Sequence, residues 1–249
     1  TIYRGDAFGA DYVGNAFVAD AGSNLVHRKV LNYADGIVPR GERPADERKM
    51  EFLASTDNWF RPVQLANGPD GCLYVLDMYR EVIEHPWSLP SGIKRHVDLN
   101  SGNDRGRIWR IRPEKFVRPA SPRLSKATSG ELASILSAPN AWRRETAARL
   151  LFERQDLQVV PALSKLAAEG ESHLGRLHAL YVLAGLDQLK PDHLLTALRD
   201  EHPVLREHAL KLAETFLAQN GKKSRLAEAV LSLGPDESPR VRFQLGLTL

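Results

Sequence analysis

A seven-residue pattern that occurs twice in the first half of the sequence restricts the possible folds more than any other feature. Residues 14–20 and 71–77 both read glycine, two variable residues, an aromatic residue, valine, one variable residue and aspartate. A second match follows each copy, because residues 24–28 align with residues 106–110. Each copy predicts a turn, a strand with alternating faces, and a second strand that ends in arginine. Two such copies are typical of related four-stranded units, as in the blades of a β-propeller.

Two blades cannot close a ring, and each leaves strand edges that need neighbours. We therefore expect residues 1–116 to be the C-terminal blades of a partial β-propeller, with the other blades upstream or in another chain. The two copies differ in one place: Asp20 and Asn24 are four positions apart, whereas Asp77 and Gly106 are 29 apart. The second copy thus carries about 25 additional residues, near 78–104. Long insertions at strand ends are common locations for function.

The second half of the sequence is predicted to be helical, because apolar residues recur there every three or four positions. A capping box at 128–131 marks a helix start, and proline stands at the first helical position at 202–203 and 238–239. The glycines at expected helix ends are Gly170, Gly185, Gly221 and Gly234. The expected helix pairs are 130–137/140–154, 158–168/172–185, 191–200/203–219 and 223–233/239–249.

The second helices of these pairs share a register. Arginine recurs at Arg144, Arg176, Arg206 and Arg242, at spacings of 32, 30 and 36 residues. Each pair has an apolar face that only the next pair can cover, so the pattern resembles HEAT repeats and predicts an α-solenoid over 128–249. We expect the arginines to pair with acidic side chains between repeats; the alternative is that they bind a ligand. The proline-containing residues 117–127 are expected to be the linker.

Composition and charge exclude several classes of protein. The net charge is only +3 and both signs are mixed along the chain, so a nucleic-acid-binding face is not predicted. No apolar run approaches the roughly 18 residues needed for a transmembrane helix. Cys72 is the single cysteine, which we expect to be a buried, inert thiol. No phosphate-binding loop, nucleophile elbow or dinucleotide fingerprint occurs.

The first candidate site residues lie where the strand at 71–77 enters the insertion. Asp77 ends that strand, where it could hold a cation, bind a substrate hydroxyl or cap the backbone of the loop. Arg80 could clamp a carboxylate of a substrate or cofactor, or it could form an ion pair with Asp77. Arg61, just before the preceding strand, is a comparable candidate for binding an anionic group.

Two further candidates lie in the insertion itself. Glu81 and His85 are four residues apart, a spacing that places two side chains on one face of a helix. They could hold a metal ion together, although a solvated helix turn has the same spacing. His85 is also a candidate general base. The metal candidates are therefore Asp77 and Glu81, the cofactor-binding candidates are Arg61, Asp77 and Arg80, and the catalytic candidates are His85, Arg80 and Arg61.

The motifs of the first half resemble a known protein family. They are the stretches at 59–63, 68–80, 83–86 and 106–111. They are similar to large exported proteins of planctomycetes and verrucomicrobia called membrane-bound dehydrogenases. The propeller of these proteins resembles that of the soluble quinoprotein glucose/sorbosone dehydrogenases. Many members continue into HEAT repeats and then into a cytochrome c module.

The resemblance implies an extracytoplasmic (periplasmic) enzyme that oxidises a sugar or alcohol with pyrroloquinoline quinone (PQQ) and calcium. Electrons would pass to a c-type haem module outside this chain, which has no Cys-x-x-Cys-His motif and so no haem site. In that interpretation His85, or a base supplied upstream, takes the hydroxyl proton, Arg80 and Arg61 hold anionic groups, and Asp77 helps to hold calcium or orients the substrate. The alternative is a non-catalytic propeller and HEAT scaffold, in which the propeller binds glycan or protein and the helical surface binds a protein partner. An intracellular HEAT adaptor is a third interpretation.

Overall fold

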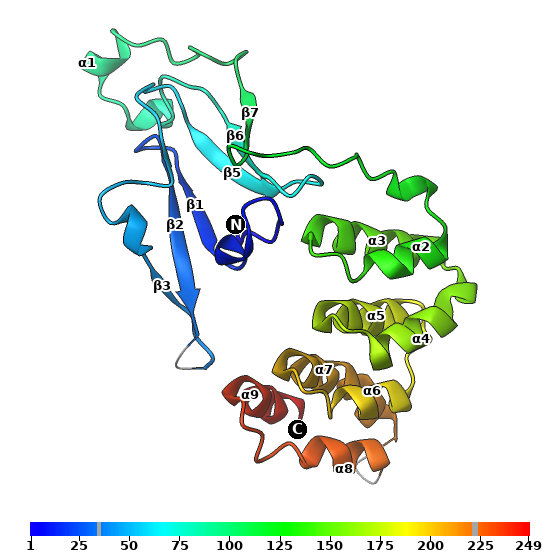
Figure 1. Ribbon diagram of the computed structural model, residues 1–249. Helices are drawn as coiled ribbons and strands as arrows, with labels where there is room; N and C mark the ends of the chain where they lie inside the picture. The colour runs from blue at the N-terminus through cyan, green and yellow to red at the C-terminus, as the bar shows by residue number, and fades with distance from the viewer. Residues whose placement is uncertain (34–35, 221–223) are drawn as a thin grey trace. The chain divides into compact units, whose positions relative to one another are not determined.

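The structure is a computed structural model that describes residues 1–33, 36–220 and 224–249. Its internal contacts divide the chain into two units (Figure 1). The sheet unit comprises Thr1–Asn32 and Arg40–Ser121, and the helical unit comprises Tyr33–Pro39 and Pro122–Leu249. All the strands that the structure describes lie in the sheet unit. The change from β to α structure follows the change in hydrophobic period.

The first sheet has four strands arranged around a tight hairpin. β1 (Ala16–Asp20) and β2 (Leu25–Asn32) pair antiparallel. β3 (Arg40–Glu42) pairs with the end of β2, and β4 (Leu53–Ala54) pairs with its beginning. The hairpin turn is held by the Asp20 carboxylate, whose Oδ1 accepts a hydrogen bond from the backbone N–H three residues later at 2.9 Å.

The second sheet contains β5 (Pro62–Asn67), β6 (Leu73–Asp77) and β7 (Arg107–Ile111), paired antiparallel in that order. The two copies of the seven-residue pattern therefore form β1 and β6, and their second matches form β2 and β7. Among the described residues this sheet has three strands, whereas the repeat predicts four. The chain reaches Pro113 soon after β7, and proline lacks the N–H that a strand ladder needs.

The core of the sheet unit takes side chains from both sheets. Phe17 and Val26 come from the first sheet, and Leu65, Leu73 and Val75 come from the second. Each is at most 5% exposed, and burying a side chain of this size stabilises the fold by about 2 kcal/mol. The sheets therefore depend on each other for stability, because a few short strands bury too little surface alone.

Short elements complete the sheet unit. The connection between β6 and β7, residues 78–106, contains a 3₁₀ turn at Pro86–Ser88 and the short helix α1 (Ser91–Lys94). Two other 3₁₀ turns of this unit are Ala10–Tyr12 and Ala45–Glu47. The long insertion predicted in the second copy is thus present as the β6–β7 connection.

The helical unit confirms the predicted helices. The helices α2 to α9 are Ser129–Ile135, Ala141–Arg154, Val160–Glu169, His173–Gly185, Pro191–Ala197, Pro203–Asn220, Arg225–Leu231 and Pro239–Thr248. Short 3₁₀ turns at Leu124–Lys126 and Leu157–Val159 precede α2 and α4. Figure 1 shows two layers, with α3, α5, α7 and α9 in one and α2, α4, α6 and α8 in the other; successive helices of each layer are in contact. Leucines that are fully buried, such as Leu163, Leu180 and Leu210, fill the space between the layers.

The helix ends follow the predicted signals. Thr128 and Glu131 form the capping box, in which the Thr128 side chain accepts from the Glu131 N–H and the Glu131 carboxylate accepts from the Thr128 N–H. Gly170 follows α4, and Gly185 is the last residue of α5. Gly221 lies outside the described residues. In the part of the chain that the structure describes, no helix is long and apolar enough to cross a membrane.

Candidate functional site

Asp77 lies buried at the centre of the predicted site, and its carboxylate bonds to groups from three segments of the sheet unit. Oδ1 accepts hydrogen bonds from the backbone N–H groups of Arg61 at 2.8 Å and Tyr79 at 2.9 Å. Oδ2 accepts from Trp109 Nε1 at 3.0 Å and lies 3.9 Å from Arg107 Nε. The side chain of Asp77 is fully shielded from solvent. Of the roles that the sequence left open, capping the loop backbone is the one these contacts support.

Arg61 places its guanidinium among backbone carbonyl groups. Nε donates to the carbonyl oxygen of Arg80, Nη1 to that of Ala21 and Nη2 to that of Glu81, each at 2.9 Å. These contacts tie the β1–β2 turn and the first residues of the β6–β7 connection to the start of β5. All three guanidinium nitrogens are engaged, so this arrangement does not favour binding of an anionic ligand by Arg61.

Arg80 does not form the ion pair with Asp77 that we considered. Its Nη1 instead donates to the carbonyl oxygen of Asn100 at 3.1 Å, across the β6–β7 connection. The backbone N–H of Arg80 donates to the carbonyl oxygen of Trp59. The residue is partly exposed. Arg80 therefore closes the base of the connection while part of its side chain faces solvent.

The helical spacing proposed for Glu81 and His85 is wrong. Residues 81–85 form no helix in the structure, so the two side chains do not share a helix face. His85 instead precedes the 3₁₀ turn, and its Nδ1 accepts a hydrogen bond from the Trp87 N–H at 3.2 Å. Proline at position 86 favours an extended backbone in the residue before it, which explains why a helix cannot run through His85. His85 is exposed, so a role in binding or proton transfer stays a prediction.

Asp77, which was predicted to help hold calcium, does not fit that purpose. Three donors already occupy the Asp77 oxygens, and solvent does not reach them. Calcium needs six to eight oxygen ligands. Within the described ranges, no group of three or more His, Cys, Asp or Glu side chains is placed to hold a metal ion.

An aromatic and cationic cluster surrounds the Asp77 site. The guanidinium of Arg107 lies 3.7 Å from the ring centroid of Tyr79 and 5.5 Å from that of Trp109. Trp59 packs edge-on against Tyr79 with centroids 5.7 Å apart. Tyr79 adopts φ 52, in the left-handed region that a tyrosine rarely occupies. The Asp77 hydrogen bond to its N–H stabilises this conformation.

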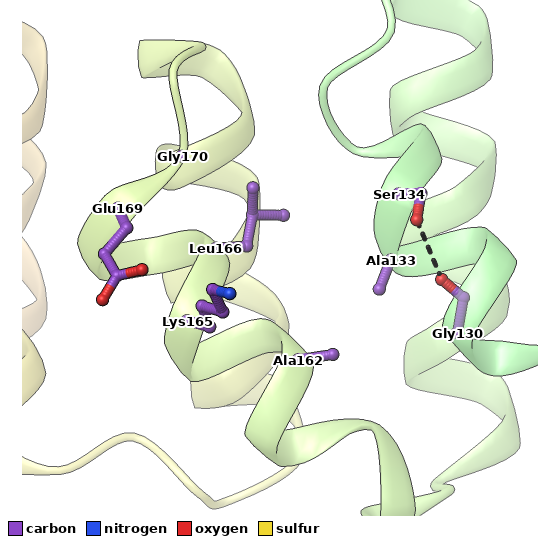
Figure 2. Close-up of a pocket in the computed structure, with 8 residues that line it drawn as sticks. All are labelled: Gly130, Ala133, Ser134, Ala162, Lys165, Leu166, Glu169 and Gly170. Carbon is purple, nitrogen blue, oxygen red and sulfur yellow. Dashed lines mark hydrogen bonds between the residues drawn. The ribbon is translucent and has the colours of Figure 1, made fainter.

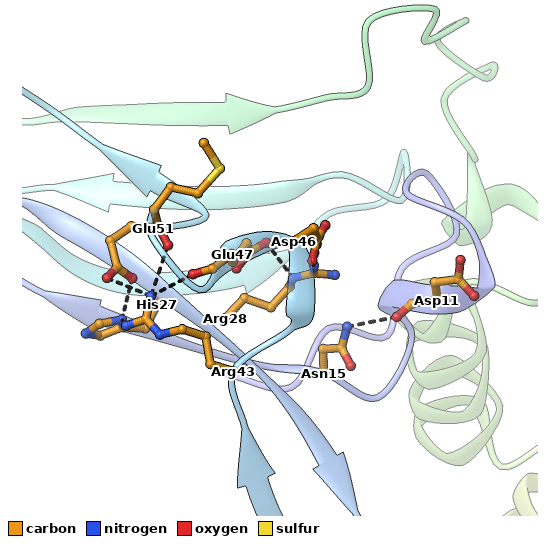
Figure 3. Close-up of polar contacts among 9 residues, drawn as sticks. Asp11, Asn15, His27, Arg28, Arg43, Asp46, Glu47 and Glu51 are labelled. Atoms are coloured by element: carbon orange, nitrogen blue, oxygen red, sulfur yellow. Dashed lines mark hydrogen bonds and ion pairs between the residues drawn. The ribbon is translucent and has the colours of Figure 1, made fainter.

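A second polar cluster, in the first sheet, was missed by the sequence interpretation (Figure 3). Arg28 is 6% exposed and donates from Nε to Glu47 Oε1 at 2.7 Å and from Nη2 to Asp46 Oδ1 at 3.2 Å. The repeat held a signal for this cluster, because Arg28 aligns with Arg110. Arg110 likewise pairs with a buried carboxylate, that of Asp70 at 3.3 Å.

His27, Arg43 and Glu51 extend this cluster. His27 Nδ1 lies 2.5 Å from Glu51 Oε2, and Arg43 Nη1 lies 2.9 Å from Glu51 Oε1 (Figure 3). Burial alone would raise the pKa of Glu51, but the hydrogen bond from Arg43 and the charge of His27 lower it below its usual value. Elsewhere in this unit, burial raises the pKa of Cys72 to about 11, which agrees with a buried, unreactive thiol.

The arginine row of the helical unit makes the contacts that the sequence predicts. Arg176 pairs with Asp200 through Nε–Oδ2 at 2.8 Å and Nη2–Oδ1 at 2.9 Å. Arg206 pairs with Asp236 in the same way, at 2.7 Å and 2.9 Å. The hydrogen bond with Arg206 lowers the pKa of Asp236, and the hydrogen bond with Asp236 raises the pKa of Arg206. Pairing with acidic side chains is therefore confirmed for Arg176 and Arg206.

A groove lies between α2 and α4 in the helical unit (Figure 2). Its volume is about 330 Å³. Its wall on α2 is formed by small residues, and its wall on α4 carries both signs of charge, from Lys165 and Glu169. The lining residues are Gly130, Ala133, Ser134, Ala162, Lys165, Leu166, Glu169 and Gly170. A groove of this kind can receive an apolar side chain of a partner, but it holds no catalytic constellation.

Comparison with known proteins adds one finding for the sheet unit. Residues 1–115 match a family described as a domain of unknown function (DUF7133), and this match covers less than half of the chain. No curated protein and no solved structure matches the chain.

Proposed function

We propose that this chain is a non-catalytic binding scaffold, in which propeller blades carry a recognition loop and HEAT-like repeats offer a second surface to a protein partner. The observation that carries this proposal is which groups two of the predicted site residues contact. The Asp77 carboxylate accepts hydrogen bonds from two backbone N–H groups and from Trp109. The Arg61 guanidinium donates to three backbone carbonyl groups. These two side chains shape the base of the β6–β7 connection and leave the connection itself exposed.

The blade arrangement is supported by an inversion of burial between equivalent positions of the two sheets. Val18 on β1 is 51% exposed, while its counterpart on β6, Val75, is fully buried. Val26 on β2 is fully buried, while its counterpart on β7, Ile108, is 67% exposed. Radially arranged blades produce this pattern because each sheet covers the opposite face of the next. Val18 and Ile108 then mark the faces where further blades are expected.

The HEAT-like arrangement is supported by a contact that recurs along the helical unit. Each arginine of the row donates from Nη1 to the carbonyl groups six and five residues before it. Arg176 uses Gly170 and Glu171 in this way, and Arg206 uses Asp200 and Glu201. Arg144 and Arg242 make the equivalent bonds. A repeated turn held by the same side chain is the property that allows helix pairs to stack.

The recognition surface that we propose is the β6–β7 connection, residues 78–106. Trp87 is 90% exposed there, and Ile93 is 49% exposed. A tryptophan side chain is seldom this exposed to water. Tryptophan contributes strongly to binding energy when a partner buries it. Its rigid apolar ring can stack on a sugar ring or enter a pocket of a protein. We favour a glycan, since sugars are also the substrate class implied by the family resemblance.

The quinoprotein-like dehydrogenase stays a second candidate, together with the periplasmic location that the resemblance implies. It is favoured by the exposure of His85 and the partial exposure of Arg80 in the same connection. It would require the quinone and calcium ligands to come from blades beyond these residues.

One pair of measurements separates the two proposals. Oligosaccharides are titrated against the full-length protein while tryptophan fluorescence is followed, and the same sugars are tested in dye-linked oxidation with added PQQ and calcium. We expect a fluorescence change that both Trp87→Ala and Trp87→Phe remove, binding by calorimetry that Trp87→Ala abolishes and Trp87→Phe retains, and no turnover. Val117→Ala, at an 86% exposed position outside the connection, serves as the control and leaves binding unchanged. Turnover that is lost in Arg80→Ala would overturn the scaffold proposal in favour of the enzyme.

A further inference from the structure

Histidine contacts gather between two neighbouring helix pairs of the helical unit, α4–α5 and α6–α7. His193 of α6 contacts α4, His202 at the start of α7 stacks on His173 of α5, and His208 of α7 contacts α5. All four rings are half-buried. Histidine is the side chain whose charge ordinarily changes between pH 5 and 8, so the protonation state of this interface matters.

His193 must be neutral to make its contacts. Its Nδ1 accepts a hydrogen bond from the backbone N–H of Lys190 at 3.0 Å, and a backbone N–H can only donate. Its Nε2 lies 3.1 Å from Ser164 Oγ on α4. Lys190 and Asp192 are the charged groups that act on it; burial, reinforced by Lys190, lowers its pKa.

His202 also accepts a backbone hydrogen bond. Its Nδ1 accepts from the backbone N–H of Val204 at 3.3 Å, while its own backbone N–H donates to Asp200. Its ring stacks on the His173 ring, with centroids 3.9 Å apart and planes 5° from parallel. Two protonated rings at this distance would repel each other. Burial lowers the pKa of His173, as do His202, Arg176 of α5 and Arg144 of α3, while Asp200 opposes them.

His208 adds a third bridge, between α7 and α5. Its Nδ1 lies 2.7 Å from the hydroxyl oxygen of Tyr181. Lys211 and Glu207 of α7 and Arg240 of α9 are the charged groups around it. Burial and the charge of Lys211 lower its pKa.

We infer that the interface between the α4–α5 pair and the α6–α7 pair is an acid-sensitive joint. Neutral histidines hold it through the His193–Ser164 hydrogen bond and the stacking of His173 on His202. Protonation of His193 removes the Lys190 hydrogen bond that orients its ring toward α4. The Arg176–Asp200 ion pair crosses the same interface and tethers the two helix pairs. Acid therefore loosens this joint and bends the array there, which would change the surface offered to a partner. The inference goes beyond the proposed scaffold function and does not depend on it.

The direction of the pH dependence follows from linkage. A histidine with a lowered pKa in the folded state binds its proton more readily when the joint opens. The closed joint is thus fully stable above the ordinary histidine pKa of about 6.5 and loses stability as pH falls from there through the lowered values. Each unit of pKa difference changes the opening equilibrium about tenfold.

The test measures hydrogen exchange of the full chain at pH values from 7.5 to 5.0, corrected for the intrinsic pH dependence of exchange. We expect opening of the α4–α7 amides to increase about tenfold or more on acidification, with no such change in β5–β7. The double variant His193→Gln/His202→Asn keeps the two backbone acceptors, since Gln and Asn suit these capping positions, but cannot be protonated. It should lose most of the increase, while His96→Asn, at an exposed position in the β6–β7 connection, should retain all of it.

Two results would overturn the inference. One is an equal pH response in the wild type and the double variant. The other is titration of His193 and His173 at ordinary pKa values in an NMR experiment, which needs no variant and so does not depend on how the variant folds.

Discussion

In the helical unit Arg176 and Arg206 make the same set of contacts one repeat apart, whereas in the sheet unit the contacts of Arg61 occur once. Each repeated arginine caps its own turn and reaches an aspartate of the next pair. Arg61 joins three segments that are distant in sequence. A repeated contact spreads stability along an array, and a single contact concentrates it at one point. The two units should therefore respond differently to loss of one polar side chain.

Asp77→Ala should have the largest effect. The substitution leaves the N–H groups of Arg61, Tyr79 and Trp109 without their acceptor in a buried site. At 1–3 kcal/mol for each such group, we expect a loss of about 4 kcal/mol in the sheet unit. Hydrogen exchange in increasing urea, which reports on the two units separately, should show the loss in β5–β7 and none in α3–α9. Asp77→Asn keeps one acceptor oxygen and should lose less. Unchanged exchange in β5–β7 would show that Asp77 is not needed for stability there, and that its carboxylate is available to bind a ligand.

Arg61→Ala should follow, with a loss of about 3 kcal/mol, because three backbone carbonyl groups lose charged donors. Arg61→Lys keeps the charge but cannot reach three carbonyls in fixed geometry, so it should recover only part of the loss. The same experiment reads both variants. If Arg61→Ala retained full stability, the guanidinium would be available to an anionic ligand after all.

The effect of pH on the stability that the Arg206–Asp236 pair contributes should be smaller than the effects of Asp77→Ala and Arg61→Ala. The pKa of Asp236 is lowered in the folded state by the hydrogen bond from Arg206, against a usual value of 3.8. The pair therefore contributes its full stability above pH 3.8 and loses it as the pH falls from there through the lowered pKa. Urea midpoints measured from pH 5 to pH 2.5 should fall more steeply in the wild type than in Asp236→Asn. Equal slopes would show that the pair contributes no acid-dependent stability.

The same contrast explains how much of the fold the sequence could predict. Helix starts and ends follow from local signals such as Thr128 and Gly170, and the Arg176 and Arg206 contacts follow from their spacing. The hairpins follow from the two copies of one short pattern. The repeat marks Arg28 through its alignment with Arg110, but its partners Asp46 and Glu47 could not be derived in this way, because they lie on another segment and no period relates them.

The sequence predicts where the polar side chains of the candidate site lie, but not which groups they bond to. Asp77 and Arg61 do meet at the base of the β6–β7 connection, as their positions at strand ends suggest. Their sequence context could not reveal that backbone groups, rather than a ligand, would occupy them. The helix assumed for Glu81 and His85 failed because Pro86 and the open loop geometry prevent it.

Two double-mutant cycles measured side by side test most directly whether the helical unit repeats one contact. The first cycle combines Arg176→Ala with Asp200→Ala, and the second combines Arg206→Ala with Asp236→Ala, each read as the free energy of unfolding. We predict coupling energies on the order of 2 kcal/mol that agree within about 0.5 kcal/mol. A clear coupling in one cycle and none in the other would contradict the account, because the two contacts would then be alike in geometry but not in energy.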